Sequence, residues 1–554
     1  MSQRVAVIGA GPSGLTSIKS CLDEGLEPTC FESSDDIGGL WRFKETPELG
    51  RTSIYRSLVV NTSKEMMCFS DFPMPADYPN YMLHSQLLQY FRLYAQHFDL
   101  LRHITFQTSV LTVRQRPDFS RSGQWEVVTE NREGQEQRHV FDGVLVCSGH
   151  YTQPVSPLDQ FPGHESFPGR CLHSWEYKDA DAFRGKRVVV VGIGNSGGDI
   201  AVEISRAAEK TFLSTRKGTW VLARMSSSGL PLDMTAISRL TVLLTSLLPR
   251  ALVNWAAERS LNHRYDHRLY GLQPTHRLLE QKPLINDDLP GRILQGAVVL
   301  KPDLRGFQGS GLLFQDGTTE EDIDAVVFCT GYNGTFSFLP PSLWVVFFYS
   351  RRVFPPALER PTLAIMGLFQ TKGPIFPAVE MQARWVTRVI AGLTQLPPRK
   401  TMLSKIETET KAASIPAALH VDYIPYLDSL AEQVGVRPNI LGLLLREPSV
   451  GLRVLLGPCT PYQYRLRGPG KWDGARQAIL TQWERVAQPF RTRLEPEPPR
   501  PLVLLSPLLI TLSAGAVMLA VVLSQCKLTL GLQDLLQDST HLLDWLSALL
   551  WGSA

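Results

Sequence analysis

The chain has 554 residues, of which 44% are hydrophobic and 20% are charged. This length exceeds one ordinary domain, and the composition is typical of a globular protein with a large core. The formal net charge is only +3, so the charge balance does not indicate a nucleic-acid partner. We therefore expect two or three folded domains and no nucleic-acid binding.

The eight cysteines are scattered along the chain and form no C-x-x-C motif. No spacing of cysteine and histidine is typical of zinc, so we predict no metal site. Buried thiols in a reducing compartment are the expected state. The first apolar run begins close to Met1 and leaves no space for a signal peptide, which predicts a catalytic body that faces the cytosol.

A first nucleotide-binding motif lies at the N-terminus. Residues 5–8 are apolar and predict a buried parallel strand, and a G-x-G-x-x-G turn follows it before a helix expected at 15–24. The glycines of this first glycine turn are Gly9, Gly11 and Gly14. Such glycines let the backbone approach a pyrophosphate, which binds at the N-terminus of the helix.

The strand after that helix is predicted at residues 27–31, and it ends at Glu32. A carboxylate at this position can accept hydrogen bonds from the hydroxyl groups of a ribose. Strand, glycine turn, helix and acid in this order predict a dinucleotide site that binds FAD.

A second glycine turn follows the apolar residues 188–191 and consists of Gly192, Gly194 and Gly197. Its helix is expected to reach about residue 209, and the next strand is predicted at 211–214. That strand leads into Thr215, Arg216 and Lys217, where the first motif has Glu32. A cation at this point suits a 2′-phosphate, so the second turn is predicted to bind NADPH.

Other apolar runs indicate how the two motifs are connected. Strands are predicted at 124–129, 140–147 and 361–368, and within 324–332, where an acid, an apolar strand, a small residue and a glycine follow one another; helices are predicted at 84–98 and 380–393. The fold class is therefore α/β, with two Rossmann-like domains. The expected domains are an FAD-binding domain of residues 1–154 and 331–445, an NADPH-binding domain inserted at 155–330 with a helical insertion at about 222–290, and a C-terminal surface segment at 446–500.

The C-terminal region contains an uncharged run of 23 residues at 502–524. This run is long enough to cross about 30 Å of hydrocarbon and predicts a transmembrane helix. The residues before it are rich in arginine, which predicts that they lie in the cytosol. The tail at 525–554 has an amphipathic helical pattern, and both a lumenal tail and a monotopic anchor stay open. The apolar run at 240–255, broken by Pro249, fits either a packed insert or one that rests on a membrane.

The assembled motifs resemble the flavin-containing monooxygenases of vertebrate microsomes over about residues 3–525. Between the two glycine turns, residues 167–177 fit that family's pattern F-x-G-x-x-x-H-x-x-x-[YF]. Residues 36–43, 61–73 and 457–476 are also similar to that family. The longer tail and the apolar residues 343–352 depart from it.

The resemblance implies roles for individual residues. Asn61 would be catalytic, because it matches the residue that orients NADP+ and the flavin. The residues implied in cofactor binding are Gly9, Gly11, Pro12, Ser13, Gly14, Glu32, Gly39, Leu40, Trp41, Asn61, Thr62, Gly192, Gly194, Asn195, Ser196, Gly197, Thr215, Arg216 and Gln382.

The resemblance also implies a reaction cycle at the endoplasmic reticulum membrane. NADPH reduces FAD, O2 adds to give a flavin C4a-hydroperoxide, and a soft nucleophile then takes one oxygen atom. The expected substrates are xenobiotic amines and sulfur compounds. Two alternatives stay open, namely Baeyer–Villiger oxidation of ketones and an NADPH oxidase that releases H2O2. A disulfide reductase is disfavoured by the missing C-x-x-C, and an inactive paralogue by the intact glycines. The sequence does not decide between a monomer and a homo-oligomer.

Overall fold

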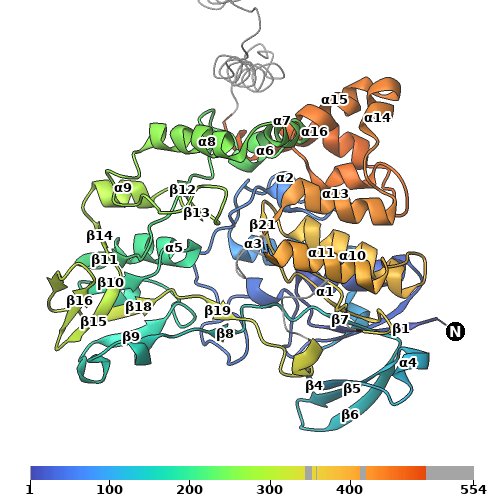
Figure 1. Cartoon of the computed structure of the whole chain (residues 1–554), viewed down its shortest axis with the longest axis horizontal. Helices are drawn as coiled ribbons and strands as arrows, with labels where there is room; N and C mark the ends of the chain where they lie inside the picture. Colours follow the sequence, from blue (N-terminus) through green and yellow to red (C-terminus); the bar gives the residue numbers. More distant parts are fainter. Residues whose placement is uncertain (1, 344–351, 357, 412–419, 494–554) are drawn as a thin grey trace, which may run out of the picture. The chain divides into compact units, whose positions relative to one another are not determined.

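The computed structural model describes residues 2–343, 352–356, 358–411 and 420–493. All of them belong to one unit, Met1–Leu494. Its framework consists of two five-stranded parallel sheets. In each sheet, a helix follows the central strand. Figure 1 shows the first sheet with α1 and α10 on the right, and the second sheet with α5 on the left. This confirms the predicted α/β class.

The first sheet is built from both ends of the folded region. Its strand order places a strand from beyond residue 360 next to strands from the first 150 residues, in the order β20 (Leu363–Ile365), β7 (Gly143–Val146), β1 (Arg4–Ile8), β2 (Glu27–Phe31), β3 (Ile104–Thr105). In β1, the side chains of residues 5–8 are all buried, as expected for a strand that is covered on both faces. Helix α1 (Pro12–Asp23) packs against α10 (Phe376–Ile390).

The second sheet uses strands between residues 170 and 328. Their order is β14 (Val298–Lys301), β11 (Lys210–Ser214), β10 (Arg187–Val191), β18 (Ala325–Phe328), β9 (Arg170–His173). Helix α5 (Asn195–Ile204) follows β10. In both sheets the strand that carries the glycine turn lies in the centre, which places each turn at the carboxyl edge of a sheet.

Smaller sheets accompany the two parallel sheets. Three-stranded antiparallel sheets are formed by β4 (Thr108–Gln115), β5 (Trp125–Asn131) and β6 (Glu136–Phe141), and by β15 (Leu304–Gln308), β16 (Gly311–Phe314) and β17 (Thr319–Glu320). Strands β8 (Gln153–Pro154) and β19 (Tyr332–Asn333) pair where the chain passes between the two large sheets. Two other pairs are β12 (Val221–Leu222) with β13 (Leu284–Ile285), and β21 (Gln370–Lys372) with β22 (His420–Asp422).

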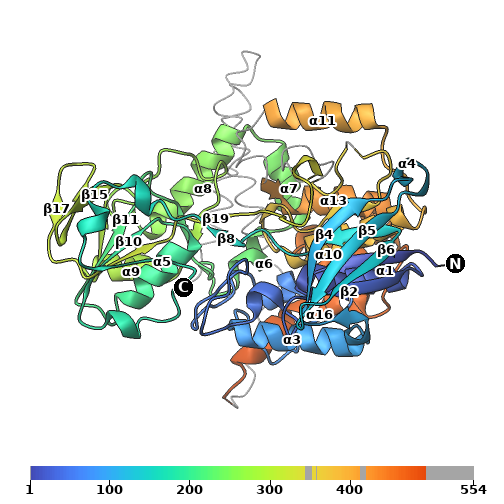
Figure 2. The same ribbon diagram turned by 90° about the horizontal axis from the view of Figure 1, so that it is seen from below.

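The remaining helices fall in three stretches of the chain. The early ones are α2 (Lys64–Met67), α3 (His84–His97) and α4 (Phe119–Ser122). The insertion between β12 and β14 carries α6 (Leu232–Ala236), α7 (Arg239–Ser246), α8 (Arg250–Arg264) and α9 (Leu289–Leu294). The last part contains α11 (Arg399–Lys411), α13 (Tyr423–Val434), α14 (Ile440–Arg446), α15 (Pro448–Leu456) and α16 (Ala475–Ala487). Figure 2 shows the same molecule from below, with β10, β11 and α5 on the left and β2, α1 and α10 on the right.

Three sequence expectations need correction. The single strand predicted at 140–147 is two strands, β6 and β7, because Asp142 interrupts the run and turns to cap the amide of Arg4. The helix expected to reach residue 209 ends at Ile204. Residues 459–466, predicted as surface, are buried, because this segment packs under α16 and against α2.

The apolar run at 240–255 does not form one continuous helix. It is divided between α7 and α8, because Pro249 lacks the amide hydrogen that an uninterrupted helix needs, and it caps α8 instead. None of the described helices has the length and apolar composition needed to cross a bilayer. The predicted membrane helix at 502–524 and the tail at 525–554 lie outside the described residues.

Candidate functional site

The first glycine turn joins β1 to α1 in a conformation that needs glycine. Gly9 has a φ of +100°, which other residues rarely adopt. A side chain on Gly14 would place its Cβ only 1.9 Å from the carbonyl oxygen of Gly9, so this position admits no larger residue. Helix α1 then begins at Pro12, where a missing amide hydrogen costs nothing, and Ser13 lies in its first turn.

A second loop closes over this turn. The amide of Gly38 donates to the carbonyl oxygen of Ala10, over 3.0 Å. A Cβ on Gly11 would lie 3.7 Å from the Cα atom of Gly39. Gly39, Leu40 and Trp41 form a short 3-10 helix, and the Trp41 ring meets Phe376 edge to face. These residues therefore lie beside the first turn, and their role in cofactor binding stays a prediction.

Glu32 lies at the end of β2 and is 4% exposed. Its carboxylate accepts hydrogen bonds from the backbone amides of Ala10 and Ser34, both over 2.8 Å, and it pairs with Arg51 at 3.1 Å. Burial opposes the charged form, but the Ala10 amide, the charge of Arg51 and Ser34 together lower the pKa of Glu32. The predicted ribose acceptor is thus held ionised beside the first glycine turn.

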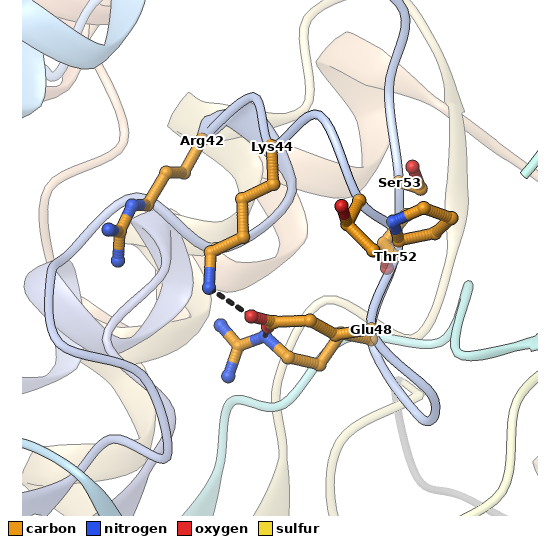
Figure 3. A pocket seen from close by; sticks show the side chains of 9 residues that line it. Arg42, Lys44, Glu48, Thr52 and Ser53 are labelled. Atoms are coloured by element: carbon orange, nitrogen blue, oxygen red, sulfur yellow. Dashed lines mark hydrogen bonds and ion pairs between the residues drawn. The ribbon is translucent and has the colours of Figure 1, made fainter. Parts of the chain in front are cut away.

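A small open pocket lies beside the loop that covers the first glycine turn (Figure 3). Gly39 belongs to that loop, and Arg51 also contacts Glu32. Lys44 bonds to Glu48 across it, as the dashed line in Figure 3 marks. Its lining residues are Gly39, Arg42, Lys44, Thr46, Pro47, Glu48, Arg51, Thr52 and Ser53. Each of its three basic side chains is paired with a carboxylate: Arg42 with Asp35, Lys44 with Glu48, and Arg51 with Glu32.

Gln382 lies on α10 and is fully buried. Its Oε1 accepts a hydrogen bond from the amide of Gly367 over 2.9 Å, and its Nε2 donates to the hydroxyl of Tyr426 over 2.6 Å. Gly367 has a φ of +75°, and a Cβ there would lie 3.3 Å from the Oγ of Ser13. Gln382 therefore supports the turn that faces the first glycine motif, and its polar atoms are engaged within the protein.

The second glycine turn repeats the geometry of the first between β10 and α5. Gly192 has a φ of +105°, and a Cβ on Gly197 would lie 1.9 Å from the Gly192 carbonyl oxygen. A Cβ on Gly194 would instead meet no atom within 4 Å, so this residue borders open space. Asn195 and Ser196 begin helix α5, and the Oδ1 of Asn195 accepts from the amide of Ile285 over 3.0 Å. The open space beside Gly194 is where a pyrophosphate would fit.

Thr215 and Arg216 directly follow β11, next to the second glycine turn. The Oγ1 of Thr215 accepts a hydrogen bond from the amide of Gly218, which shapes the loop. The side chains of Arg216 and Lys217 are exposed. The cations predicted to contact a 2′-phosphate are therefore accessible to a ligand.

Asn61 and Thr62 lie in the loop before α2, and both are half-buried. The Oδ1 of Asn61 accepts a hydrogen bond from Arg224 over 2.7 Å. Arg224 follows β12, in the half of the structure that contains the second parallel sheet, whereas Asn61 belongs to the half that contains the first. Asn61 therefore lies where these two halves meet. The next residue, Ser63, donates its amide to Asp233 on α6 over 2.7 Å, which fixes the loop to the insertion.

Sequence reasoning missed the charged partners of these residues. Arg51 pairs with Glu32, and Arg224 bonds to Asn61, but neither arginine lies in a recognisable motif. Arg224 and Asn61 are 163 residues apart, a separation at which a sequence pattern carries no pairing signal. Nor do the described residues contain a group of three His, Cys, Asp or Glu side chains that could hold a metal ion.

Comparisons with known sequences match this architecture to one family. The family model described as "FMO-like: Flavin-binding monooxygenase-like" matches residues 2–527. The chain is 52% identical to human flavin-containing monooxygenase 5 over 501 residues, which cover 89% of this chain and 94% of that protein. It is also 52% identical to mouse dimethylaniline monooxygenase [N-oxide-forming] 2 over 503 residues, with the same coverage of both chains.

Solved structures share the fold at lower sequence identity. The S-allyl-L-cysteine S-oxygenase of Allium sativum superposes with a TM-score of 0.61 at 23% identity, over 88% of this chain and 99% of that one. A cyclohexanone monooxygenase gives a TM-score of 0.57 at 17% identity, over 78% of this chain and 97% of that one. The flavin and monooxygenase predictions are confirmed: the chain belongs to the flavin-binding monooxygenase-like family and is an oxidoreductase.

Proposed function

We propose that the protein is an NADPH- and O2-dependent monooxygenase that binds FAD at the first glycine turn and NADPH at the second. The observation that carries this proposal is the pairing of two complete glycine turns with different partners. An ionised, buried Glu32 stands beside one turn, and an exposed Arg216 stands beside the other. An acid suits a ribose hydroxyl, whereas a cation suits a 2′-phosphate.

The residues present fit both cofactors. At the first turn, Gly11 and Gly39 have no side chains, so a diphosphate can approach the amides at the start of α1. At the second, the space beside Gly194 gives the same access to α5. Bound FAD would accept a hydride from NADPH and activate O2 for transfer of one oxygen atom.

The side chains of the protein would position the reactants and would form no covalent bond with them. Asn61 is proposed to touch the reacting groups through its side-chain amide, which can donate two hydrogen bonds. Leu40 and Trp41 would cover the flavin side of the loop, and Trp41 is braced by Phe376. Covering this site excludes water, which protects a reactive oxygen donor from breakdown.

The proposed substrates are small soft nucleophiles, namely amine nitrogen and sulfur. Two relatives that are each 52% identical to this chain are named flavin-containing monooxygenase 5 and dimethylaniline monooxygenase [N-oxide-forming] 2. Among the solved structures that share the fold are an S-oxygenase and a cyclohexanone monooxygenase. Oxidation of ketones is therefore kept as the second candidate, and both substrate classes belong in the assay.

The domain boundaries and the location are also proposals. Strands β1, β2, β7 and β20 share one sheet, which supports an FAD-binding domain of 1–154 and 331–445 with the NADPH-binding domain, 155–330, inserted into it. The uncharged residues 502–524 support an anchor in the endoplasmic reticulum membrane, with the catalytic body in the cytosol. Membrane lipid would then be a partner.

The direct test is oxygen transfer by the purified full-length protein. With NADPH and ¹⁸O2, the proposal expects one labelled oxygen atom in the product of an aryl methyl sulfide or a tertiary amine. A ketone that yields a labelled ester would favour the second candidate. Release of H2O2 in amounts equal to the NADPH consumed, without product, would contradict both and indicate an oxidase.

A further inference from the structure

One arginine joins the two halves of the structure at the residue proposed to be catalytic. Arg224 follows β12, and its side chain is 13% exposed. Its Nε donates to the carbonyl oxygen of Val60 over 3.2 Å, and one terminal nitrogen donates to the Oδ1 of Asn61 over 2.7 Å. The guanidinium therefore binds the backbone of Val60 and the side chain of Asn61, which are adjacent residues in the other half of the molecule.

The contact determines which way the Asn61 amide points. A guanidinium group has only donors, so the atom of Asn61 that faces it must be the carbonyl oxygen. The Nδ2 group then points away from Arg224. No described residue accepts a hydrogen bond from Nδ2 in the structure, so both of its hydrogens are available to a ligand.

Arg224 is itself held by Asp287. The other terminal nitrogen donates to the Oδ2 of Asp287 over 2.9 Å, and the backbone amide of Arg224 donates to Oδ1 over the same distance. With both oxygens of the carboxylate engaged by one residue, the guanidinium has a fixed plane. A lysine could keep the charge but could not make the three side-chain contacts together.

The segment that carries Asp287 also contacts the second glycine turn. The amide of Ile285 donates to the Oδ1 of Asn195, over 3.0 Å, and the side chain of Asn286 donates to Asp199 on α5, over 2.6 Å. Three consecutive residues thus connect the proposed NADPH site, through Arg224, to Asn61. A nucleotide that displaces or tightens this segment would act on the same arginine.

We propose that Arg224, held by Asp287, is a positioning residue that orients the side-chain amide of Asn61 so that its nitrogen faces the reacting groups. This inference rests on the proposed function, which gives Asn61 its role. Its consequence is coupling: with the amide misoriented, NADPH would still be consumed, but more of the oxygen would leave as H2O2.

Other contacts between the two halves make the fold tolerant of a change at Arg224. Tyr55 donates to Asp199 over 2.6 Å, Ser57 donates to Glu203 over 2.8 Å, and the Trp175 ring donates to the carbonyl oxygen of Arg51 over 2.7 Å. These bonds do not involve Arg224. A variant at Arg224 is therefore expected to keep both halves joined.

The test uses the full-length protein with its cofactors and four variants: Arg224→Gln, Arg224→Lys, Asn61→Ala and the double variant Asn61→Ala with Arg224→Gln. We measure oxygenated product and H2O2 per NADPH. Both Arg224 variants should lower the ratio of product to H2O2 about tenfold or more, because small misplacements of a reacting group have effects of that size. Arg206→Gln is the matched control, because it removes an exposed pair with Asp288, the neighbour of Asp287.

The double variant separates positioning from a general structural role. If Arg224 acts through Asn61, then Arg224→Gln has no further effect on the product ratio in the Asn61→Ala background. An equal effect in both backgrounds, or Lys performing as well as Arg, would overturn the proposal.

A second readout does not depend on turnover. The fall in unfolding midpoint caused by Arg224→Gln should be smaller when Asn61 is already alanine, since the contact is then absent. Equal falls would contradict the contact. If the wild-type protein forms no oxygenated product, the proposed function fails, and the unfolding measurements still decide whether Arg224 holds Asn61.

Discussion

At the scale of single residues, Glu32 favours its charged form although it is buried, because hydrogen-bond donors and a cation surround its carboxylate. The amides of Ala10 and Ser34 and the guanidinium of Arg51 surround it. We expect Glu32→Gln to lower the free energy of unfolding by about 1–3 kcal/mol at neutral pH, the usual loss when hydrogen bonds to a buried charge are removed. The variant should also retain less FAD. Thermal unfolding and flavin absorbance measure both effects.

The same substitution makes a prediction about pH. The pKa of Glu32 is lowered in the folded protein, so its stabilisation is present above its ordinary value of 4.5 and is lost as the pH falls through the folded-state pKa. The difference in unfolding midpoint between wild type and Glu32→Gln should therefore shrink in acid. Glu27→Gln, an exposed change on the same strand, is the control, and a difference that grows in acid would contradict the account.

In the second glycine turn, Gly197 is needed for folding, whereas Gly194 is proposed to be needed for binding. Gly194 has an extended backbone and open space beside it, so Gly194→Ala should leave the unfolding midpoint unchanged. The added methyl group would occupy the approach of a pyrophosphate and should raise the KM for NADPH by about tenfold or more. Gly197→Ala should instead destabilise the protein, because its Cβ would lie 1.9 Å from the Gly192 carbonyl oxygen. An unchanged KM in Gly194→Ala would contradict the second site.

At the scale of elements, a buried charge cluster connects the C-terminal segment to α10, to α1 and to the segment that follows α2. Arg465 is 2% exposed and pairs with Glu380 at 2.7 Å and with Asp71 at 2.8 Å. Lys19 also pairs with Asp71. Several elements that are distant in sequence therefore depend on one guanidinium.

Removal of this guanidinium should be costly. We expect Arg465→Met to lower the free energy of unfolding by about 3–5 kcal/mol, because it leaves buried carboxylates without their cation. Arg476→Gln breaks the half-exposed pair with Glu447 and should cost at most about 1 kcal/mol. Chemical denaturation of both variants measures the difference. Equal losses would mean that the buried cluster does not hold these elements together.

Elements with a local pattern could be predicted from the sequence, and elements that depend on distant contacts could not. The strands beside both glycine turns were found because apolar runs and glycines are adjacent in the chain. Residues 459–466 lie in the segment 446–500 that was expected at the surface, yet tertiary packing buries them. Asn61 was found by resemblance, whereas Arg224 is brought to it by the fold.

At the scale of the whole molecule, the two parallel sheets meet through side chains and backbone groups that belong to neither glycine turn. The Tyr55 hydroxyl bonds to Asp199 on α5, and the Trp175 ring bonds to the backbone of Arg51. This arrangement would hold the proposed flavin and nicotinamide sites in one unit, as hydride transfer between two bound cofactors requires.

Membrane attachment makes a separate prediction for the whole chain. Full-length protein expressed in cells should stay in the membrane pellet after washing with alkaline carbonate, because residues 502–524 are long enough to span a bilayer. Deletion of residues 502–554 should move a large part of the protein to the supernatant. Full-length protein in the supernatant would contradict the anchor.

The measurement that tests the central claim most directly is the balance of NADPH, H2O2 and oxygenated product for the purified full-length protein under ¹⁸O2. The account predicts that a sulfide, amine or ketone gains one labelled oxygen atom and that product formation accounts for most of the NADPH consumed. NADPH consumption with H2O2 as the sole product, or no NADPH consumption at all, would contradict it.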